Sequence, residues 1–386
     1  MFQLQRLMFC RKRDGMRIVK IVFIQIGVTV LLMEAALWAF FPVSNKIEYK
    51  QMVSQNIPGL KKIITYDRNE FGFRSLSMKT KEKPVNTIRI LCLGASTTDQ
   101  TTQNTADTWS GLLEKKLKPI FAAKGINIEV AARGRSGELI SDRLKWVKSS
   151  VMEFQPDIVV TLEGINDLAF AGPDAKPHEE KNLEATRTTL AERLAVFSQI
   201  VRRLKIIKNN LHIAKLLKEG KAVEWHSEHL AERIKDYQAL PYVDHLERSY
   251  DPLPPFSEDL DEIVGFLSGR NIDVVVLAQP VLYNANMTDE ELQVLWFPIN
   301  SAEGKIRPSL QWLIAEVDKF NVAQAGTAQK YGAAFIDLNQ KIPKNLKVFF
   351  DDCHYTDYGS EAVADAIIPV LTEKVDRRLI KQYAHE

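Results

Sequence analysis

The sequence predicts an α/β fold in which a central parallel sheet lies between two layers of helices, a three-layer α/β/α sandwich. Its predicted strands are near-continuous apolar runs, such as residues 157–162 and 272–278, as expected for strands that are covered on both faces. These runs alternate along the chain with longer segments whose apolar residues recur at helical spacing. Polar motifs directly follow several of the runs, and in an open parallel sheet such positions meet at one edge.

The predicted elements follow one another in a regular order. Strands are expected at residues 87–93, 126–131, 157–162, 272–278 and 333–338. Helices are expected at residues 108–124, 138–153, 303–331 and 358–380. The first helix has apolar residues at helical spacing at Trp109, Leu112, Leu113 and Leu117, and the second ends before Pro156.

A helical insert without strand signals separates the third predicted strand from the fourth, at about residues 170–255. Within it, residues 202–221 carry seven Lys or Arg residues and an approximate apolar stripe, which indicates a basic amphipathic helix. Such a helix can rest on a membrane surface, but packing on its own domain with a solvated basic face is the interpretation we favour. We expect the insert to overhang the edge of the sheet, and residues 242–255 to form its return loop.

An apolar segment near the N-terminus predicts a membrane anchor. Residues Ile21–Phe41 carry one charge, Glu34, and a helix of this length spans roughly 30 Å, the thickness of a bilayer core. Six Lys or Arg residues precede the segment and three follow it closely, so the positive-inside rule places the N-terminus in the cytoplasm. A cleaved signal peptide is the alternative, but the run is long and no Ala-x-Ala site follows it. Glu34 either snorkels, which we favour, or marks a helix partner.

These features divide the chain into four regions. They are a cytoplasmic basic tail at residues 1–20, a transmembrane signal anchor at residues 21–42, a stalk and pre-domain segment at residues 43–83, and the α/β domain at residues 84–386. The expected location is the inner (cytoplasmic) membrane, with a single pass and with the α/β domain outside the cytoplasm.

Composition is that of an ordinary folded protein, with 45% hydrophobic and 26% charged residues among 386. A net charge of +2 gives no reason to expect a nucleic-acid partner. Three cysteines are too few for a disulfide framework, so a sizeable core must stabilise the fold.

Three short motifs stand beside predicted strand ends. They are Gly94-Ala95-Ser96, Gly164-Ile165-Asn166-Asp167 and Asp351-Asp352-Cys353-His354. Each alone is common turn or capping chemistry. Together and in this order they supply a serine, an amide donor and a histidine with a carboxylate, which are the groups that serine-based acyl transfer requires.

Other catalytic classes lack their motifs. Thr98 stands where the Gly-x-Ser-x-Gly elbow of α/β-hydrolases needs its second glycine, and no glycine-rich phosphate loop occurs. His226 and His229 flank Glu228, but there is no His-Glu-x-x-His and no cysteine pair at zinc spacing, so an exposed helical face is the favoured interpretation. We therefore expect neither a metal nor an organic cofactor.

The motifs resemble those of the SGNH (GDSL-like) hydrolase family over roughly residues 65–375. In this resemblance Ser96 is the nucleophile, His354 the base and Asp351 the residue that orients the base. The oxyanion hole is formed by the Ser96 backbone, the Gly134 backbone and the Asn166 side chain. The resemblance also implies a flavodoxin-like arrangement of the sheet.

Two positions depart from the family pattern. Ala95 replaces the aspartate of Gly-Asp-Ser-Leu, and Ala132 stands where many relatives have an asparagine. Neither departure removes a catalytic atom. Asp352, only two residues before His354, is expected to be a loop or helix-capping residue.

The resemblance implies a serine esterase that hydrolyses an oxygen ester, on an acylated small molecule, glycan or lipid, through an acyl-serine intermediate. An O-acyltransferase acting on cell-envelope glycan would use the same residues. A catalytically silent glycan-binding or assembly module is a third possibility, against which the intact motifs argue. The expected partners are the acylated substrate and the membrane, through the N-terminal helix, with no nucleic acid.

Overall fold

The computed structural model of the 386-residue chain contains two compact units. The larger comprises residues 45–180 and 213–386, and the smaller comprises residues 1–44 and 181–212. The structure describes residues 21–22, 24–37, 47–52, 59–61, 63–171, 227–244, 250–301 and 304–383, together with residues 200, 203–204, 207, 211, 215, 246.

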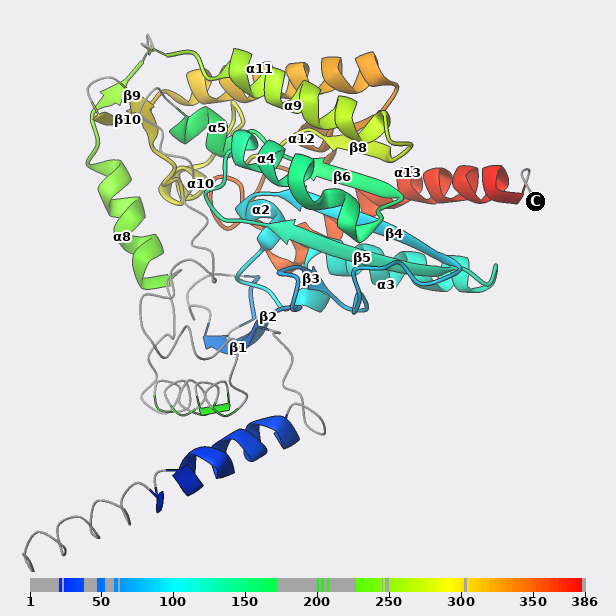
Figure 1. The fold of residues 1–386 in the computed structure, drawn as a ribbon. Coiled ribbons are helices and arrows are strands. Elements are labelled where there is room, and N and C mark those ends of the chain that lie inside the picture. Colours follow the sequence, from blue (N-terminus) through cyan, green and yellow to red (C-terminus); the bar gives the residue numbers. More distant parts are fainter. Residues whose placement is uncertain are drawn as a thin grey trace, which may run out of the picture. The chain divides into compact units, whose positions relative to one another are not determined.

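A six-stranded sheet forms the centre of the larger unit (Figure 1). In chain order its strands are β3 (Arg74–Ser75), β4 (Thr87–Gly94), β5 (Asn127–Gly134), β6 (Ile158–Leu162), β8 (Asp273–Leu277) and β11 (Ala334–Ile336). Their order across the sheet is β11-β8-β6-β4-β5-β3, and all except β3 are parallel to their neighbours. The parallel part is the doubly wound 2-1-3-4-5 arrangement, in which sites form at the carboxyl ends of the strands.

All five predicted strands are present, but the sheet is mixed rather than entirely parallel. At its edge β3 runs antiparallel to β5, with Arg74 opposite Ala132. The prediction of a parallel sheet is wrong at this edge, because a two-residue strand is too short to show a hydrophobic period.

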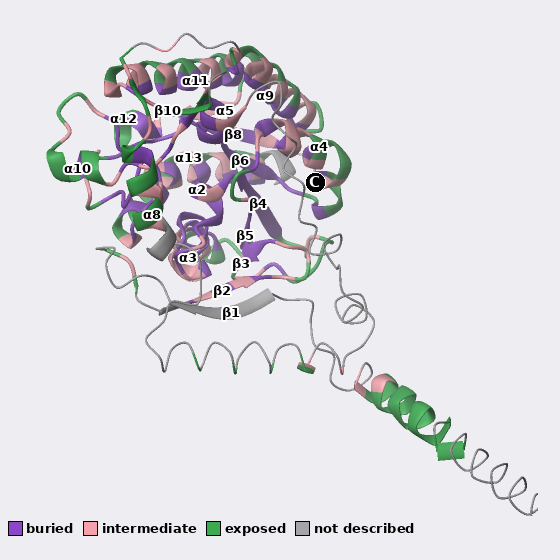
Figure 2. Ribbon diagram, turned by 90° about the vertical axis from the view of Figure 1, so that its left-hand side faces the viewer, coloured by how far each residue is buried: buried purple, intermediate pink, exposed green. Residues whose placement is uncertain are grey.

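Helices cover both faces of the sheet, so the three-layer arrangement is confirmed. On one face α3 (Trp109–Ala122) and α13 (Asp357–Tyr383) pack together, and on the other lie α4 (Ile140–Ser150), α9 (Leu253–Ser268) and α11 (Leu310–Tyr331) (Figure 1). Figure 2 shows the central strands buried between these layers, and every residue of β4 and β6 is buried.

Helix α9 departs from the prediction, which placed a return loop up to residue 255. Its first turn contains Pro254 and Pro255. Proline is tolerated there because the first N–H groups of a helix have no partner within it. The shorter elements are α2 (Ser96–Asp99), α5 (Ile165–Phe170), α8 (Ser227–Gln238), α10 (Asp289–Gln293), α12 (Leu338–Lys341) and 3₁₀ turns at Thr105–Asp107 and Val151–Phe154.

The helix predicted at residues 303–331 begins later, at Leu310. Before it, β9 (Ile299–Ser301) and β10 (Gly304–Pro308) form a hairpin, and β10 also pairs with β7 (Tyr242–Val243) from the insert. Ser309 caps α11 by accepting a hydrogen bond from the Trp312 N–H at 3.3 Å. The helix therefore starts where a capping side chain is available.

Part of the predicted stalk and pre-domain segment is a hairpin. Strands β1 (Ile47–Met52) and β2 (Ile63–Arg68) pair antiparallel along their whole length. In the following turn, the Asn69 side chain accepts hydrogen bonds from the N–H groups of Phe71 and Phe73, at 3.1 and 3.0 Å. This turn leads the chain directly into β3.

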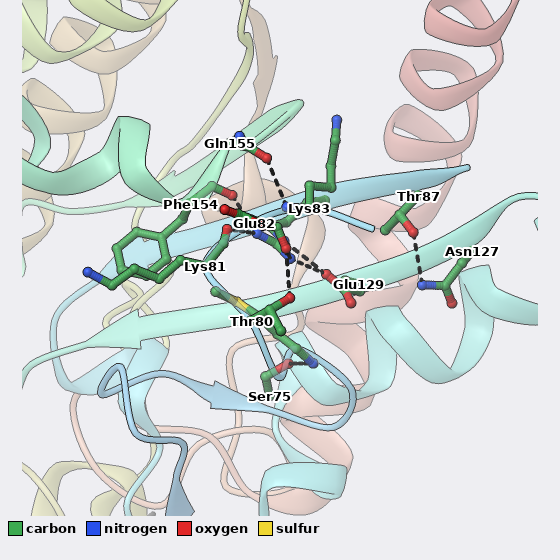
Figure 3. A network of polar contacts seen from close by, with 12 residues as sticks. Ser75, Thr80, Lys81, Glu82, Lys83, Thr87, Asn127, Glu129, Phe154 and Gln155 are labelled. Atoms are coloured by element: carbon green, nitrogen blue, oxygen red, sulfur yellow. Dashed lines mark hydrogen bonds and ion pairs between the residues drawn. The ribbon is translucent and has the colours of Figure 1, made fainter. Parts of the chain in front are cut away.

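Buried Arg89 of β4 holds the amino end of the sheet. Figure 3 shows the polar network around it, which includes Lys81, Glu82, Glu129 and Phe154. The Arg89 guanidinium pairs with Glu129 of β5 at 2.8 Å and donates to the backbone carbonyls of Lys81, Glu82 and Phe154 at 2.5, 3.1 and 2.7 Å. A buried charge is tolerated when it is paired and fully hydrogen-bonded. The network thus fastens the segment before β4 at the end of the sheet remote from the three motifs.

In the smaller unit, residues 21–22 and 24–37 are helical and most of their apolar side chains are exposed (Figure 2). Residues 23 and 38–42 of the predicted anchor lie outside the described residues. Within the described part of the chain, no helix combines the length and the apolar character needed to cross a bilayer. Glu34 accepts a hydrogen bond from the Ile200 N–H at 3.1 Å, so this carboxylate has a partner in its own unit.

Candidate active site

Ser96 follows the end of β4 and is the first residue of α2. The strand ends at Gly94, where a side chain would overlap Thr98 and would come within 2.6 Å of the Leu162 carbonyl of β6. Glycine is therefore required at this position, where the chain turns from β4 into α2 close to the end of β6. The turn places Ser96 at the carboxyl edge of the sheet, at the point where strand order reverses.

The structure brings together three of the predicted site residues. His354 Nε2 lies 2.8 Å from Ser96 Oγ. On the other side of the ring, His354 Nδ1 lies 2.8 Å from Asp351 Oδ2 and 3.0 Å from Oδ1. Because an ionised carboxylate only accepts hydrogen bonds, Nδ1 carries the proton and Nε2 is the acceptor that faces the serine hydroxyl.

Asp351 and His354 shift each other's protonation in opposite directions. Burial raises the pKa of Asp351, whereas His354 and hydrogen bonds from neighbouring backbone N–H groups lower it, and the net shift is downward. Burial lowers the pKa of His354, whereas the Asp351 carboxylate raises it, and the net shift is upward from 6.5. An ionised Asp351 thus stabilises the protonated imidazole.

Asp352 is buried in the loop before α13, which is one of the two roles expected for it, and it does not cap a helix. Its carboxylate accepts hydrogen bonds from the Trp296 N–H and the Tyr283 hydroxyl, both at 2.7 Å. The first turn of α13 is capped instead by Thr356, which accepts a hydrogen bond from the Gly359 N–H at 3.1 Å. Burial and the neighbouring Asp351 charge raise the pKa of Asp352 to about 7.

Asn166 and Gly134, the predicted oxyanion donors, occupy different positions. Asn166 lines the same cavity as Ser96, and its Nδ2 also donates to the Glu138 carbonyl at 3.0 Å. Gly134 is not among the residues that line the cavity, and a side chain there would overlap the backbone of Asp99. The cavity-lining glycine after β5 is Gly137, which adopts a φ of 81° in the turn beyond the strand.

Two arginines from the segment before β4 hold α2 in place. Arg68 pairs with Asp99 at 2.7 Å and donates to the Gly134 carbonyl at 2.9 Å. Arg74 is buried and donates to the carbonyls of Asp99, Gln100 and Gln103, the last two at 2.6 Å each. These contacts fix the C-terminal end of the short helix that begins with Ser96.

Buried charges also connect the Ser96 turn to Asn166. Arg143 of α4 pairs with Glu138 at 2.6 Å and with Glu163 at 2.9 Å, and it donates to the Gly94 carbonyl. Glu138 is the residue whose carbonyl accepts from Asn166. Because removing one partner of a buried ion pair leaves an uncompensated charge, this network gives the turn and the amide a rigid support.

A cavity of about 560 Å³ opens in front of Ser96 and His354. One side is formed by residues of α2, α5 and the turn after β5. The other is formed by α8 and the hairpin region, including Leu230, Arg233, Tyr237, Trp296, Phe297 and Lys305. Helix α8 belongs to the insert, so a described part of the insert shapes the cavity as expected. The lining combines aromatic and aliphatic side chains with polar and charged ones, which suits an organic ligand.

Within the described residues, Asp351, Cys353 and His354 form a cluster whose donor atoms lie within 4.8 Å of one another, as a metal site would require. Both Asp351 oxygens and His354 Nδ1 are already hydrogen-bonded to each other or to backbone. Burial raises the pKa of Cys353 well above its ordinary value, so the ligand form, the thiolate, is disfavoured. The cluster therefore fits a hydrogen-bonded acid and base better than a metal centre. His226 and the side chain of His229 lie outside the described residues.

Trp296, Gly137 and Arg233 are site residues that the sequence did not single out. The available signal for Gly137 is a glycine that follows a predicted strand. Gly134 follows the same strand and shows the same signal. Trp296 and Arg233 reach the site from segments far from the motifs, so no local pattern marks them.

Comparison with known proteins agrees with the motif assignment. Residues 92–362 match the model of the GDSL-like Lipase/Acylhydrolase family. Among curated proteins no match was found. Similar solved structures include TesA, with 12% identity, coverage of 74% of this chain and 99% of that chain, and a TM-score of 0.37. Another is an acetylxylan esterase from Geobacillus stearothermophilus, with 13% identity, coverage of 73% of this chain and 93% of that chain, and a TM-score of 0.40. A third is the acetyl xylan esterase AlAXEase, with 14% identity, coverage of 73% of this chain and 99% of that chain, and a TM-score of 0.39.

Proposed function

Because the chain belongs to the GDSL-like Lipase/Acylhydrolase family and is a carboxylic ester hydrolase of that family, we propose that Ser96 is its nucleophile. The observation that carries this proposal is the line of contacts from Ser96 Oγ through His354 to Asp351, with 2.8 Å at each step. A serine hydroxyl is a weak nucleophile until an adjacent base removes its proton, and this geometry supplies that base.

In the proposed reaction, His354 Nε2 takes the proton of Ser96 Oγ while Oγ attacks the ester carbonyl carbon. The alcohol oxygen then leaves with the proton held on Nε2, and an acyl-serine remains. A water molecule, deprotonated by the same nitrogen, attacks this acyl group, and the acid departs as Ser96 Oγ regains its proton. Asp351 stabilises the imidazolium in both halves of the cycle.

We assign the oxyanion donors to the Ser96 backbone, Asn166 Nδ2 and the backbone of Gly137 in place of Gly134. Asn166 and Gly137 both line the cavity that contains Ser96, whereas Gly134 packs behind α2. Each such donor stabilises the charge that develops on the carbonyl oxygen, and losing one typically costs about 10²–10³ in kcat.

The substrate is proposed to be an oxygen ester of an acylated glycan or a lipid. Aromatic and aliphatic side chains line the 560 Å³ cavity together with polar and charged ones, which supports a substrate with both apolar and polar surface around the ester. Acyl transfer to a sugar hydroxyl would use the same acyl-serine, and the silent binding module is disfavoured because the nucleophile, base and acid are all assembled.

Product analysis tests hydrolysis against transfer. We expect incubation with an acylated oligosaccharide to release the free acid in amounts equal to the alcohol, even with a tenfold excess of unacylated oligosaccharide. The acid and the re-acylated acceptor are measured together by mass spectrometry. Acyl groups recovered mainly on the acceptor would support the transferase, whereas turnover that persists in Ser96→Ala would reject the mechanism.

A pH profile tests the role of His354. The groups that set its pKa are Asp351, Asp352 and Arg233, and the net shift is upward from 6.5. Because the base must be neutral, kcat/KM should be full at high pH and should fall as pH drops through a midpoint above 6.5. A midpoint below 6.5, measured over pH 5–9 with a neutral ester, would contradict the assignment of His354 as the base coupled to an ionised Asp351.

We propose that residues 21–42 anchor the chain in the inner membrane and that the larger unit faces away from the cytoplasm. The exposed apolar side chains of the described helix, such as Leu31 and Leu32, support this proposal, as does the basic tail before it. Full-length protein should sediment with membranes, and a chain that starts at Asn45 should be soluble and active. A full-length chain that stays in the supernatant would reject the anchor.

A further inference from the structure

We propose that Trp296 is a positioning residue for Asp351, and that buried Asp352 acts through Trp296 to hold it in place. The inference rests on the proposed function, because it concerns the acid that orients His354. It explains why the chain keeps two adjacent carboxylates buried beside one base.

The first step is the hydrogen bonding of Asp351. Its Oδ1 accepts from the N–H groups of Cys353 and His354, at 3.0 and 2.8 Å. Its Oδ2 accepts from His354 Nδ1 at 2.8 Å and from Trp296 Nε1 at 2.9 Å. A carboxylate has about four lone-pair sites, so these four donors saturate it. Trp296 is the one of these four donors that comes from a separate part of the chain, so it ties the carboxylate to a segment outside the turn.

The second step is the anchoring of Trp296. Trp296 lies in the loop between α10 and β9, where no helix or strand holds the backbone. Asp352 Oδ2 accepts a hydrogen bond from the Trp296 backbone N–H at 2.7 Å. Asp352 itself is held by the Tyr283 hydroxyl, which donates to Oδ1, and by the Leu282 N–H, which donates to the Asp352 carbonyl. The two neighbouring carboxylates thus bind one tryptophan, one at its indole nitrogen and the other at its backbone.

Keeping these two carboxylates together is costly. Both are fully buried, and burial with the adjacent Asp351 charge raises the pKa of Asp352 to about 7. An apolar residue at position 352 would avoid the repulsion, but it could not accept the hydrogen bonds from the Trp296 N–H and the Tyr283 hydroxyl. The Asp352 carboxylate accepts a hydrogen bond from the Trp296 backbone N–H. This contact holds in place the indole that donates to Asp351.

The third step is the position of the indole in the cavity. Trp296 lines the cavity in front of Ser96, and its ring plane lies within 2° of the His354 ring plane. The Arg233 guanidinium of α8 lies over the same indole ring, 4.5 Å from its centroid. One ring therefore forms part of the cavity wall and also holds the acid that orients the base.

The test separates a hydrogen bond to Asp351 from a packing role. Trp296→Phe keeps a ring in the cavity and removes the N–H. A hydrogen bond to a charged group is worth roughly a tenfold change in turnover, so kcat should fall about tenfold while KM changes less than about twofold. Trp312→Phe, a matched substitution on α11 away from the cavity, should leave both constants unchanged. A cavity-wall role alone would instead raise KM.

A double-mutant cycle tests whether Trp296 acts through Asp351. In the Asp351→Asn background, Trp296→Phe should change kcat by less than about twofold, because the acceptor it positions is gone. Asp352→Ala, which removes the acceptor of the Trp296 N–H, should lower kcat, and combining it with Trp296→Phe should add little. An unchanged kcat in Trp296→Phe, or an equal loss in both backgrounds, would overturn the inference. If Ser96→Ala retains activity, the proposed function fails; if it is inactive while Trp296→Phe is normal, only this inference fails.

Discussion

Ser96→Ala should abolish labelling by a fluorophosphonate probe and lower kcat for a short-chain nitrophenyl ester by about 10⁴-fold or more. The reason is that, among the described residues, Ser96 supplies the hydroxyl that lies in contact with His354 Nε2, at 2.8 Å. The alanine variant loses the group that forms the acyl intermediate, but it keeps the base, the acid and the oxyanion donors. Folding is checked by its melting temperature, which should change little because Ser96 is only partly buried.

Ser136 offers a matched control. It lines the same cavity, so it meets the same probe. Ser136→Ala should keep labelling and turnover within about twofold, because cavity surroundings alone do not activate a hydroxyl. Labelling that disappears with Ser136 and persists without Ser96 would move the nucleophile and refute the assignment.

The sheet could be predicted because its strands are buried on both faces. In β4 and β6 every residue is buried, and the chain encodes this as near-continuous apolar runs, interrupted by Arg89 in β4 and Thr161 in β6. The helices that cover the sheet bury one face each, so their apolar residues recur at the helical spacing of about 3.6 residues. Short elements carry no such signal: β3 and β7 have two residues each, and tertiary pairing alone makes them strands.

The oxyanion glycine shows how a small boundary error reaches the site. The predicted second strand ends at residue 131, so Gly134 is expected in the turn beyond it. The observed β5 continues to Gly134, which lies opposite Gly94 of β4. The turn therefore begins three residues later, and Gly137 rather than Gly134 lines the cavity that contains Ser96. Local composition cannot distinguish two glycines so close together.

The pre-domain segment shows a second limit. The sequence gives no role to Arg74, yet its buried guanidinium holds the loop that follows Ser96. Arg68 likewise joins Asp99 to the end of β5. Both contacts span about thirty residues or more of sequence, so they follow from the fold rather than from any local pattern.

Asp351→Asn should lower kcat by between about tenfold and about 10⁴-fold, the upper figure being the loss that the serine-protease triad shows for the same substitution. An amide can accept at its oxygen from the N–H groups of Cys353 and His354. Its NH₂ group would then face two further donors, His354 Nδ1 and Trp296 Nε1. The imidazole relieves this clash by moving its proton to Nε2, and that tautomer cannot accept the proton of Ser96.

The pH profile of Asp351→Asn and a comparison with Asp352→Asn distinguish loss of the orienting carboxylate from a general disturbance of the turn. The Asp351 carboxylate raises the pKa of His354, so the acid limb of kcat/KM in Asp351→Asn should move to lower pH, not merely lose height. Asp352→Asn keeps the carboxylate that contacts the imidazole, and its loss of kcat should be smaller. Both kcat/KM profiles and melting temperatures are measured for the pair. Because the two residues are adjacent and equally buried, a general effect of disturbing the turn would weaken both alike. A larger kinetic defect in Asp352→Asn, or an unmoved acid limb in Asp351→Asn, would show that Asp351 does not orient the base.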